Sequence, residues 1–175
     1  YKVSFVNNVA NVEISDSLKK TLAGGQSYNY YAGGVLGYGE NDENYCAIDS
    51  IIGSRTSGSI RVAANSTNVS GLKANAYLGG VAGSACIKTK SDGFAKNSSS
   101  MHVESAVMTG DNNVFVGGLL GAASIFGNVE MILKNLTFTG SVKVAAGSDV
   151  VNVGGVLGGF INDLRSNKVS FNSVN

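Results

Sequence analysis

A short glycine-rich box recurs four times along the chain and limits its fold more than any other feature. The box reads Gly-Gly-[Val/Leu]-x-Gly, and its copies begin at Gly33, Gly79, Gly117 and Gly154. These first glycines are 46, 38 and 37 residues apart. Two residues before the box stands an aromatic side chain in three copies (Tyr31, Tyr77 and Phe115) and Asn152 in the fourth. A nearly fixed period indicates a repeat architecture, in which each unit buries its apolar face on its neighbours.

A second pattern keeps the same period between the boxes. Apolar residues alternate with a polar one in Ile60-Arg61-Val62, Met101-His102-Val103 and Val142-Lys143-Val144, at spacings of 41 residues. A weaker copy is Val12-Glu13-Ile14, 48 residues before the first of these, and the loop from Tyr38 to Tyr45 accounts for the extra length. Alternation with a period of two predicts strands. A third short strand is expected at residues 46–48, 85–87 and 124–126.

The composition favours strands and tight turns over helices. The chain has 24 Gly and no Pro, and Ser and Asn fill the stretches between the apolar segments. We therefore predict an all-β fold, a single-stranded parallel β-solenoid (β-helix) of about four coils. Each coil would have roughly 40 residues and three short strands. Residues 1–175 would form one repeat domain, with coils at about 1–50, 51–92, 93–133 and 134–175. A β-sandwich is the alternative fold, although it requires no fixed period.

The recurring box resembles the GLUG motif, a repeat found in bacterial surface proteins that include adhesins and immunoglobulin A peptidases. The resemblance covers residues 31 to 160 and implies a repeat region at the cell surface. In the peptidases the metal-binding active site lies outside such repeats, and its His-Glu-x-x-His motif is absent from this sequence. The resemblance therefore implies a structural or adhesive role and no enzymatic activity.

Charge and hydropathy exclude two classes of partner. Only 14% of the residues are charged and the formal net charge is +1, so no nucleic-acid footprint is expected. The longest mostly apolar stretch, residues 114–127, is shorter than the roughly 18 to 20 residues of a membrane-spanning helix. The chain opens with Tyr1 and shows no charged-then-apolar leader, so we expect a mature product or a piece of something longer. The resemblance to surface-protein repeats implies an extracellular or cell-surface location.

Candidate functional residues are few. The sequence indicates no nucleophile or carboxylate partner for His102, so we interpret this residue as a solvated strand residue. Cys46 and Cys86 occupy the same place in adjacent repeats, and they would form a disulfide or a buried stack of free thiols.

Two surface features have a ligand-binding interpretation. The loop that holds Glu40, Asp42 and Glu43 offers oxygen ligands of the kind that calcium prefers, although its spacing differs from an EF-hand. It is therefore a calcium candidate, and no other cofactor is expected. A carbohydrate-active β-helix enzyme is the alternative function, and these carboxylates would then have to act as its catalytic pair. Exposed tyrosines can stack on a sugar or anchor a partner protein. The candidate ligand-contact residues are therefore Tyr28, Tyr30, Tyr38 and Tyr45.

The glycines of the box are predicted to be structural. Four doublets carry this prediction: Gly33 and Gly34, Gly79 and Gly80, Gly117 and Gly118, and Gly154 and Gly155. Glycine allows backbone angles and close approaches that other residues resist. Substituting Gly34 or Gly118 by Val should therefore destabilise the protein far more than replacing Lys143 by Ala.

The two ends of the chain resemble each other. Residues 2–5 read Lys-Val-Ser-Phe, as do residues 168–171, so the chain is expected to start and stop at the same phase of the repeat. We predict an extracellular structural or adhesive module that acts as a rigid display stalk. Self-association through the ends or neighbouring repeats, giving a filament, is the second hypothesis. A host or cell-surface glycan or protein is the other expected partner.

Overall fold

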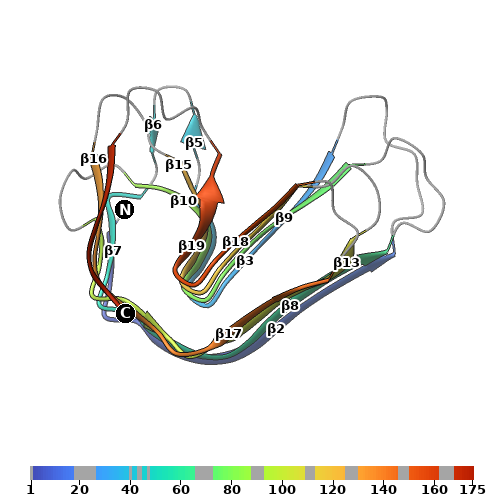
Figure 1. Cartoon of the computed structure of the whole chain (residues 1–175), viewed down its shortest axis with the longest axis horizontal. Helices are drawn as coiled ribbons and strands as arrows, with labels where there is room; N and C mark the ends of the chain where they lie inside the picture. The colour runs from blue at the N-terminus through green and yellow to red at the C-terminus, as the bar shows by residue number, and fades with distance from the viewer. Residues whose placement is uncertain are drawn as a thin grey trace.

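A computed structural model describes residues 2–17, 27–39, 41–42, 45–46, 48–65, 73–87, 93–108, 113–124, 130–145, 150–161 and 168–175. Within these ranges the secondary structure is β throughout, so the all-β prediction is confirmed. Figure 1 looks along the direction in which strands from successive repeats lie side by side.

The largest sheet has ten strands and forms the long curved ribbon at the bottom and one side of Figure 1. Its strands are β1 (Lys2–Ser4), β2 (Asn7–Ser17), β7 (Ser50–Ile52), β8 (Arg55–Asn65), β11 (Phe94–Ala95), β12 (Ser98–Ser99), β13 (His102–Met108), β16 (Glu130–Phe138), β17 (Ser141–Val144) and β20 (Lys168–Val174). One row of neighbours runs β1, β7, β11, β16 and β20, and all pairs are parallel.

Two four-stranded parallel sheets flank the glycine box. The upstream sheet consists of β3 (Ser27–Gly33), β9 (Lys73–Gly79), β14 (Asn113–Gly117) and β18 (Val150–Gly154). The downstream sheet consists of β4 (Leu36–Gly39), β10 (Ala82–Cys86), β15 (Leu120–Ser124) and β19 (Leu157–Phe160). A short antiparallel pair, β5 (Asn41–Asp42) and β6 (Tyr45–Cys46), completes the described strands.

The predicted single-stranded solenoid of about four coils with three short strands each is wrong. The described strands form three separate parallel sheets, of ten, four and four strands. The doublet does not bend one strand; it ends β9 at Gly79, and β10 begins at Ala82 in another sheet. The second apolar segment is also longer than expected, because β2 and β8 run for 11 residues each.

Close backbone contacts explain the glycine box. A Cβ built on Gly79 would lie 2.0 Å from the carbonyl oxygen of Ala82, three residues ahead in the turn. One on Gly80 would lie 2.2 Å from the carbonyl oxygen of Gly118 in the next repeat. One on Gly83 would lie 2.6 Å from the Tyr77 carbonyl oxygen of the upstream strand. In this repeat, each of the three glycines therefore removes a different steric clash.

The core lies in two clusters separated by the box. The first is between the upstream sheet and the β2–β8–β13–β17 part of the large sheet, and includes Ile60, Leu78, Val103 and Val116. The second packs the downstream sheet on the β7–β11–β16 part and includes Ile51, Val81, Phe94, Leu119 and Leu133. All nine of these side chains are 0% exposed.

A row of left-handed residues forms the bend between the two halves of the large sheet. Five residues at equivalent places in successive strands have positive φ: Phe5 (54°), Gly53 (71°), Lys96 (56°), Asn135 (51°) and Ser173 (52°). The bend is held by backbone hydrogen bonds between neighbouring repeats, such as Gly53 N–H to the Ala95 carbonyl and Lys96 N–H to the Lys134 carbonyl. Only Gly and Asn among the five commonly adopt this conformation.

The register of β13, and that of the two ends of the chain, differs by two residues from the alignment of the repeats in the sequence. Ile60 pairs with Val103, and Val103 with Val142, so Glu104 rather than His102 lies between Arg61 and Lys143. A shift of two keeps the apolar face buried, so the alternation alone does not distinguish the two registers. The two ends are offset in the same way, because Val3 shares its row with Phe171 and not with Val169.

Candidate binding groove

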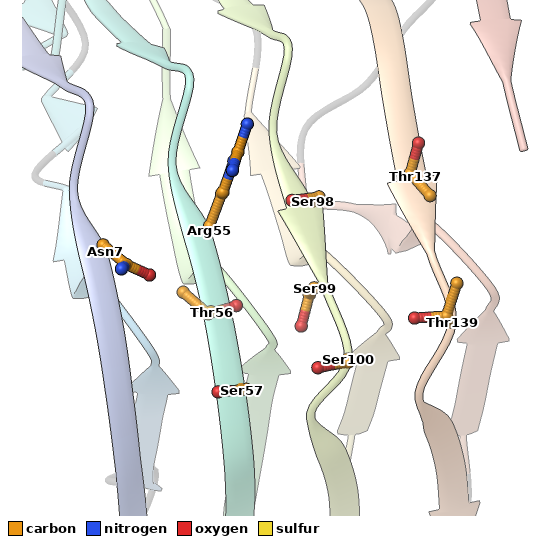
Figure 2. Close-up of a pocket in the computed structure, with 9 residues that line it drawn as sticks. All are labelled: Asn7, Arg55, Thr56, Ser57, Ser98, Ser99, Ser100, Thr137 and Thr139. Atoms are coloured by element: carbon orange, nitrogen blue, oxygen red, sulfur yellow. The ribbon is translucent and has the colours of Figure 1, made fainter.

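A polar groove crosses four neighbouring strands of the large sheet at its bend (Figure 2). We name it the hydroxyl groove. Its volume is about 270 Å³ and it is lined by Asn7, Arg55, Thr56, Ser57, Ser98, Ser99, Ser100, Thr137 and Thr139. Seven of these nine side chains carry a hydroxyl group.

The strand register aligns these side chains in two rows. Arg55 pairs with Asn7 on one side and with Ser98 on the other, and Ser98 pairs with Thr137. Ser57, Ser100 and Thr139 follow two residues later along three of these strands (Figure 2). Neighbouring strands are about 4.8 Å apart and alternate residues about 7 Å apart. The groove is therefore a regular lattice of hydrogen-bonding groups.

The residues between the two rows point inward. Thr56 and Ser99 are 4% and 3% exposed, whereas Asn7, Arg55, Ser100, Thr137 and Thr139 are exposed. The Ser99 hydroxyl accepts from the Met101 backbone N–H at 3.2 Å. The strand alternation therefore leaves hydroxyls on the outer face while the intervening residues are buried.

A second pocket continues the hydroxyl groove. It measures about 380 Å³, shares Asn7 and Arg55 with the groove, and adds Phe5, Val6, Gly53 and Lys96. The Phe5 ring is 80% exposed and lies against Gly53, where a Cβ would be 2.8 Å from the ring. None of the described residues that line the two pockets is acidic. The continuous surface thus combines hydroxyls, an exposed aromatic ring and two cations, Arg55 and Lys96.

The predicted tyrosine contacts are only partly exposed. Tyr28 and Tyr30 are half-buried and pack against the first core cluster. Tyr38 is 45% exposed, and its ring centroid lies 4.5 Å from that of Tyr31. The side chain of Tyr45 lies outside the described part of the chain. Tyr38 is therefore the described member of this set with the largest exposed surface.

An aromatic row continues from Tyr38 into the protein. Tyr31 stacks on Tyr77 at 4.8 Å, and Tyr77 on Phe115 at 5.3 Å, each with an interplanar angle of 10°. Burial, with smaller contributions from Tyr77 and Tyr38, raises the pKa of Tyr31 to about 12. Burial and then Tyr38 also raise the pKa of Tyr77. Both hydroxyls therefore stay protonated at neutral pH.

The other candidate residues are placed as follows. Glu40 and Glu43 lie outside the described residues, as does the Asp42 side chain, so the calcium site stays a prediction. The described residues contain no cluster of three metal-ligating side chains. Cys86 is fully buried and disulfide-bonded, which favours the disulfide over two free thiols, whereas the Cys46 side chain is outside the described set. His102 is exposed and bonds to the Ser141 hydroxyl.

The sequence contains a repeated pattern that indicates the hydroxyl groove, although the abundance of Ser and Asn makes this pattern hard to recognise. The triplets Arg55-Thr56-Ser57, Ser98-Ser99-Ser100 and Thr137-Phe138-Thr139 recur near the repeat period, with a polar residue at the first and third positions. In a chain this rich in Ser and Asn, such triplets resemble turn residues. Only the strand pairing brings them together as one surface.

Comparison with protein-family models, curated proteins and solved structures found no match. The described residues include no helix long and apolar enough to cross a membrane. The hydroxyl groove therefore has to be interpreted from its own chemistry.

Proposed function

We propose that the protein is an extracellular structural and adhesive module that binds a glycan in the hydroxyl groove. The observation that carries this proposal is the alignment of Asn7, Arg55, Ser98 and Thr137 across four paired strands. Parallel strands hold such a row at fixed spacing, so the binding groups are preorganised and lose little entropy when a ligand binds. A rigid sheet that presents ligand contacts suits adhesion or display.

The groove chemistry favours a linear polysaccharide that carries carboxylates. Hydroxyl side chains donate and accept hydrogen bonds, as sugar hydroxyls do. Arg55 can bind a carboxylate with two parallel hydrogen bonds, and no described carboxylate pairs with it. Phe5 offers an exposed ring face at the end of the same surface. A uronic-acid chain that crosses the strands would meet all three kinds of group.

Isothermal titration calorimetry with oligogalacturonate tests this proposal, with a neutral oligosaccharide of equal length as the comparison ligand. We expect Arg55→Ala to weaken binding about tenfold or more, since a charge-assisted hydrogen bond contributes about 1.5–3 kcal/mol. Arg61→Ala is the matched control, because Arg61 pairs with Glu13 and Glu104 and does not line the groove. Equal binding by both variants, or equal affinity for the neutral sugar, would contradict the assignment.

End-to-end assembly into a filament is the second candidate function. The observation that favours it is the exposure of Val151 and Val153 on β18, at 44% and 52%. Their paired residues in β14, Val114 and Val116, are both 0% exposed. Negative-stain electron microscopy over a concentration series tests this function. Fibres of uniform width that lengthen with concentration would support it, and short particles at every concentration would contradict it.

A further inference from the structure

Two opposite edges of the sheets have no strand partner among the described residues. One edge consists of β17, β18 and β19, and the other of β2, β3 and β4. We propose that the first edge of one molecule binds the second edge of another copy, and that β20 then takes the place of β1 in that copy. This inference rests on the second candidate function, filament assembly. It specifies the contact between neighbouring copies, which we call the joint.

Charge complementarity supports a second copy as the occupant. Side chains of alternating sign form one row across the large sheet: Glu13, Arg61, Glu104 and Lys143. Neighbours along it are paired, with N–O distances of 2.9, 3.6 and 3.2 Å. The row ends on an exposed Lys143 at one edge and an exposed Glu13 at the other. Stacking two copies in register places Lys143 beside Glu13 and continues the alternation.

Side-chain size is complementary at the downstream sheet. The row that begins with Tyr38 continues through Ser84 and Ala122 and ends at Gly159. The neighbouring row begins with Gly39 and ends at Phe160. In a stacked pair, Tyr38 of the second copy covers Gly159, and Phe160 lies over its Gly39. Large side chains thus meet glycines on both rows.

The glycine box also fits a further layer. In the first three repeats, a Cβ on the second glycine would lie 2.0–2.4 Å from a carbonyl oxygen of the following repeat. At Gly155 a Cβ would meet nothing within 4 Å. A second copy would place the carbonyl of its own Gly34 at that point. Gly155 would then need to be glycine for the same reason as Gly118.

The exchange of strands follows from the number of strands in each row. The row of β1, β7, β11, β16 and β20 has five strands, whereas the upstream and downstream sheets have four each. Stacking β3 on β18 and β4 on β19 therefore puts β20 and the second copy's β1 in the same layer. β20 pairs through six residues and β1 through three. The longer strand has more hydrogen bonds to offer, so β20 should displace β1.

Phe171 is the residue that gains most from the exchange. It is 57% exposed on β20, yet its row contains Ile51, Phe94 and Leu133, which are all 0% exposed. In the joint Phe171 lies beside Ile51 of the second copy, at the place that Val3 occupies in the free molecule. Burying an aromatic ring of this size is a substantial driving force.

The test applies one substitution at both ends of the same row. Val3→Asp weakens β1, and Phe171→Asp weakens β20. Assembly is followed by light scattering and electron microscopy, and folding by thermal unfolding of the unassembled protein. We expect Val3→Asp to lower the critical concentration for assembly. Phe171→Asp should raise it about tenfold or more, a factor that corresponds to about 1.4 kcal/mol.

Gly155→Val tests whether β18 forms part of the joint, separately from the question of whether filaments form at all. We expect it to unfold at the wild-type temperature but not to assemble. If wild-type protein forms filaments and Val3→Asp slows or does not change assembly, strand exchange is wrong while stacking stands. If Gly155→Val assembles like wild type, β18 is not in the joint. If neither wild type nor Val3→Asp assembles at any concentration, the filament function fails and the joint with it.

Discussion

Glu104 on β13 lies directly opposite Arg61 on β8, with 3.6 Å between the Arg61 Nε and a Glu104 carboxylate oxygen. The other carboxylate oxygen of Glu104 is 3.2 Å from the Lys143 ammonium nitrogen on β17. The Glu104 side chain is 19% exposed, so water screens these two ion pairs only in part. A register shifted by two residues would instead place His102 between two cations. The ion pairs therefore select one register from two that bury the same apolar face.

Reversing the charge of Glu104 should destabilise the protein by about 1–2 kcal/mol. Glu104→Lys removes two ion pairs and places three cations in one row, and each such cross-strand change contributes about 0.2–1 kcal/mol. Urea unfolding at low and at high ionic strength measures the effect, which should shrink as salt is added. His102→Lys is the control and should cost less, since His102 pairs with Ser59 and Ser141. Equal losses from the two variants would contradict the observed register.

The second glycine of the box should tolerate a methyl group in the last repeat but not in the third. Gly118→Ala would place Cβ 2.0 Å from the Gly155 carbonyl oxygen and 2.4 Å from the Phe138 ring, so we expect a loss of about 3 kcal/mol. Gly155→Ala meets nothing within 4 Å and should change stability by less than about 0.5 kcal/mol. Chemical denaturation of the two variants checks this prediction. Similar losses at both positions would mean that the box acts through backbone conformation rather than through contact with the next repeat.

Asn97 should be the most sensitive polar residue of the bend. Its side chain is 1% exposed, accepts from the Ser54 N–H at 2.9 Å and donates to the Ile51 carbonyl at 2.9 Å. Asn97→Ala leaves both buried backbone groups without these partners, at a cost of about 2–4 kcal/mol. Asn135→Gly is the control, because Asn135 is exposed at a positive φ that glycine adopts readily. Thermal unfolding should rank Asn97→Ala well below wild type and Asn135→Gly close to it.

The sequence was informative where a residue type is needed for steric reasons. The glycine box could be predicted as structural because a Cβ at Gly80 or Gly118 cannot be accommodated. The period was also visible, since equivalent strands must repeat the same apolar pattern to share one core. The number of sheets could not be predicted, because nothing in the doublet distinguishes a bend within one strand from a crossing between two sheets.

Other features depend on pairing between distant segments. The left-handed bend includes Phe5, Lys96 and Ser173, which have no intrinsic preference for positive φ. It is imposed by hydrogen bonds between repeats, so local propensity does not indicate it. The hydroxyl groove was missed for a similar reason. Ser98 and Thr137 acquire meaning only when strand register places them beside Arg55.

Alkaline pH should destabilise the protein through the aromatic row. Burial raises the pKa of Tyr31 to about 12 from the ordinary value of 10, with smaller contributions from Tyr77 and Tyr38. Between these pH values the unfolded chain has released the Tyr31 proton while the folded protein still holds it. The unfolded state therefore binds fewer protons, and stability falls as pH rises from 10 to about 12, then levels off as Tyr31 ionises in the folded protein as well. Tyr31→Phe should reduce this slope in unfolding experiments across the same pH range, and the part that remains is expected from Tyr77, whose pKa is also raised by burial. Phe115→Leu, which disturbs the row without removing a titratable group, should lower stability and leave the slope unchanged. A slope that Tyr31→Phe leaves undiminished would mean that Tyr31 does not contribute to the alkaline transition.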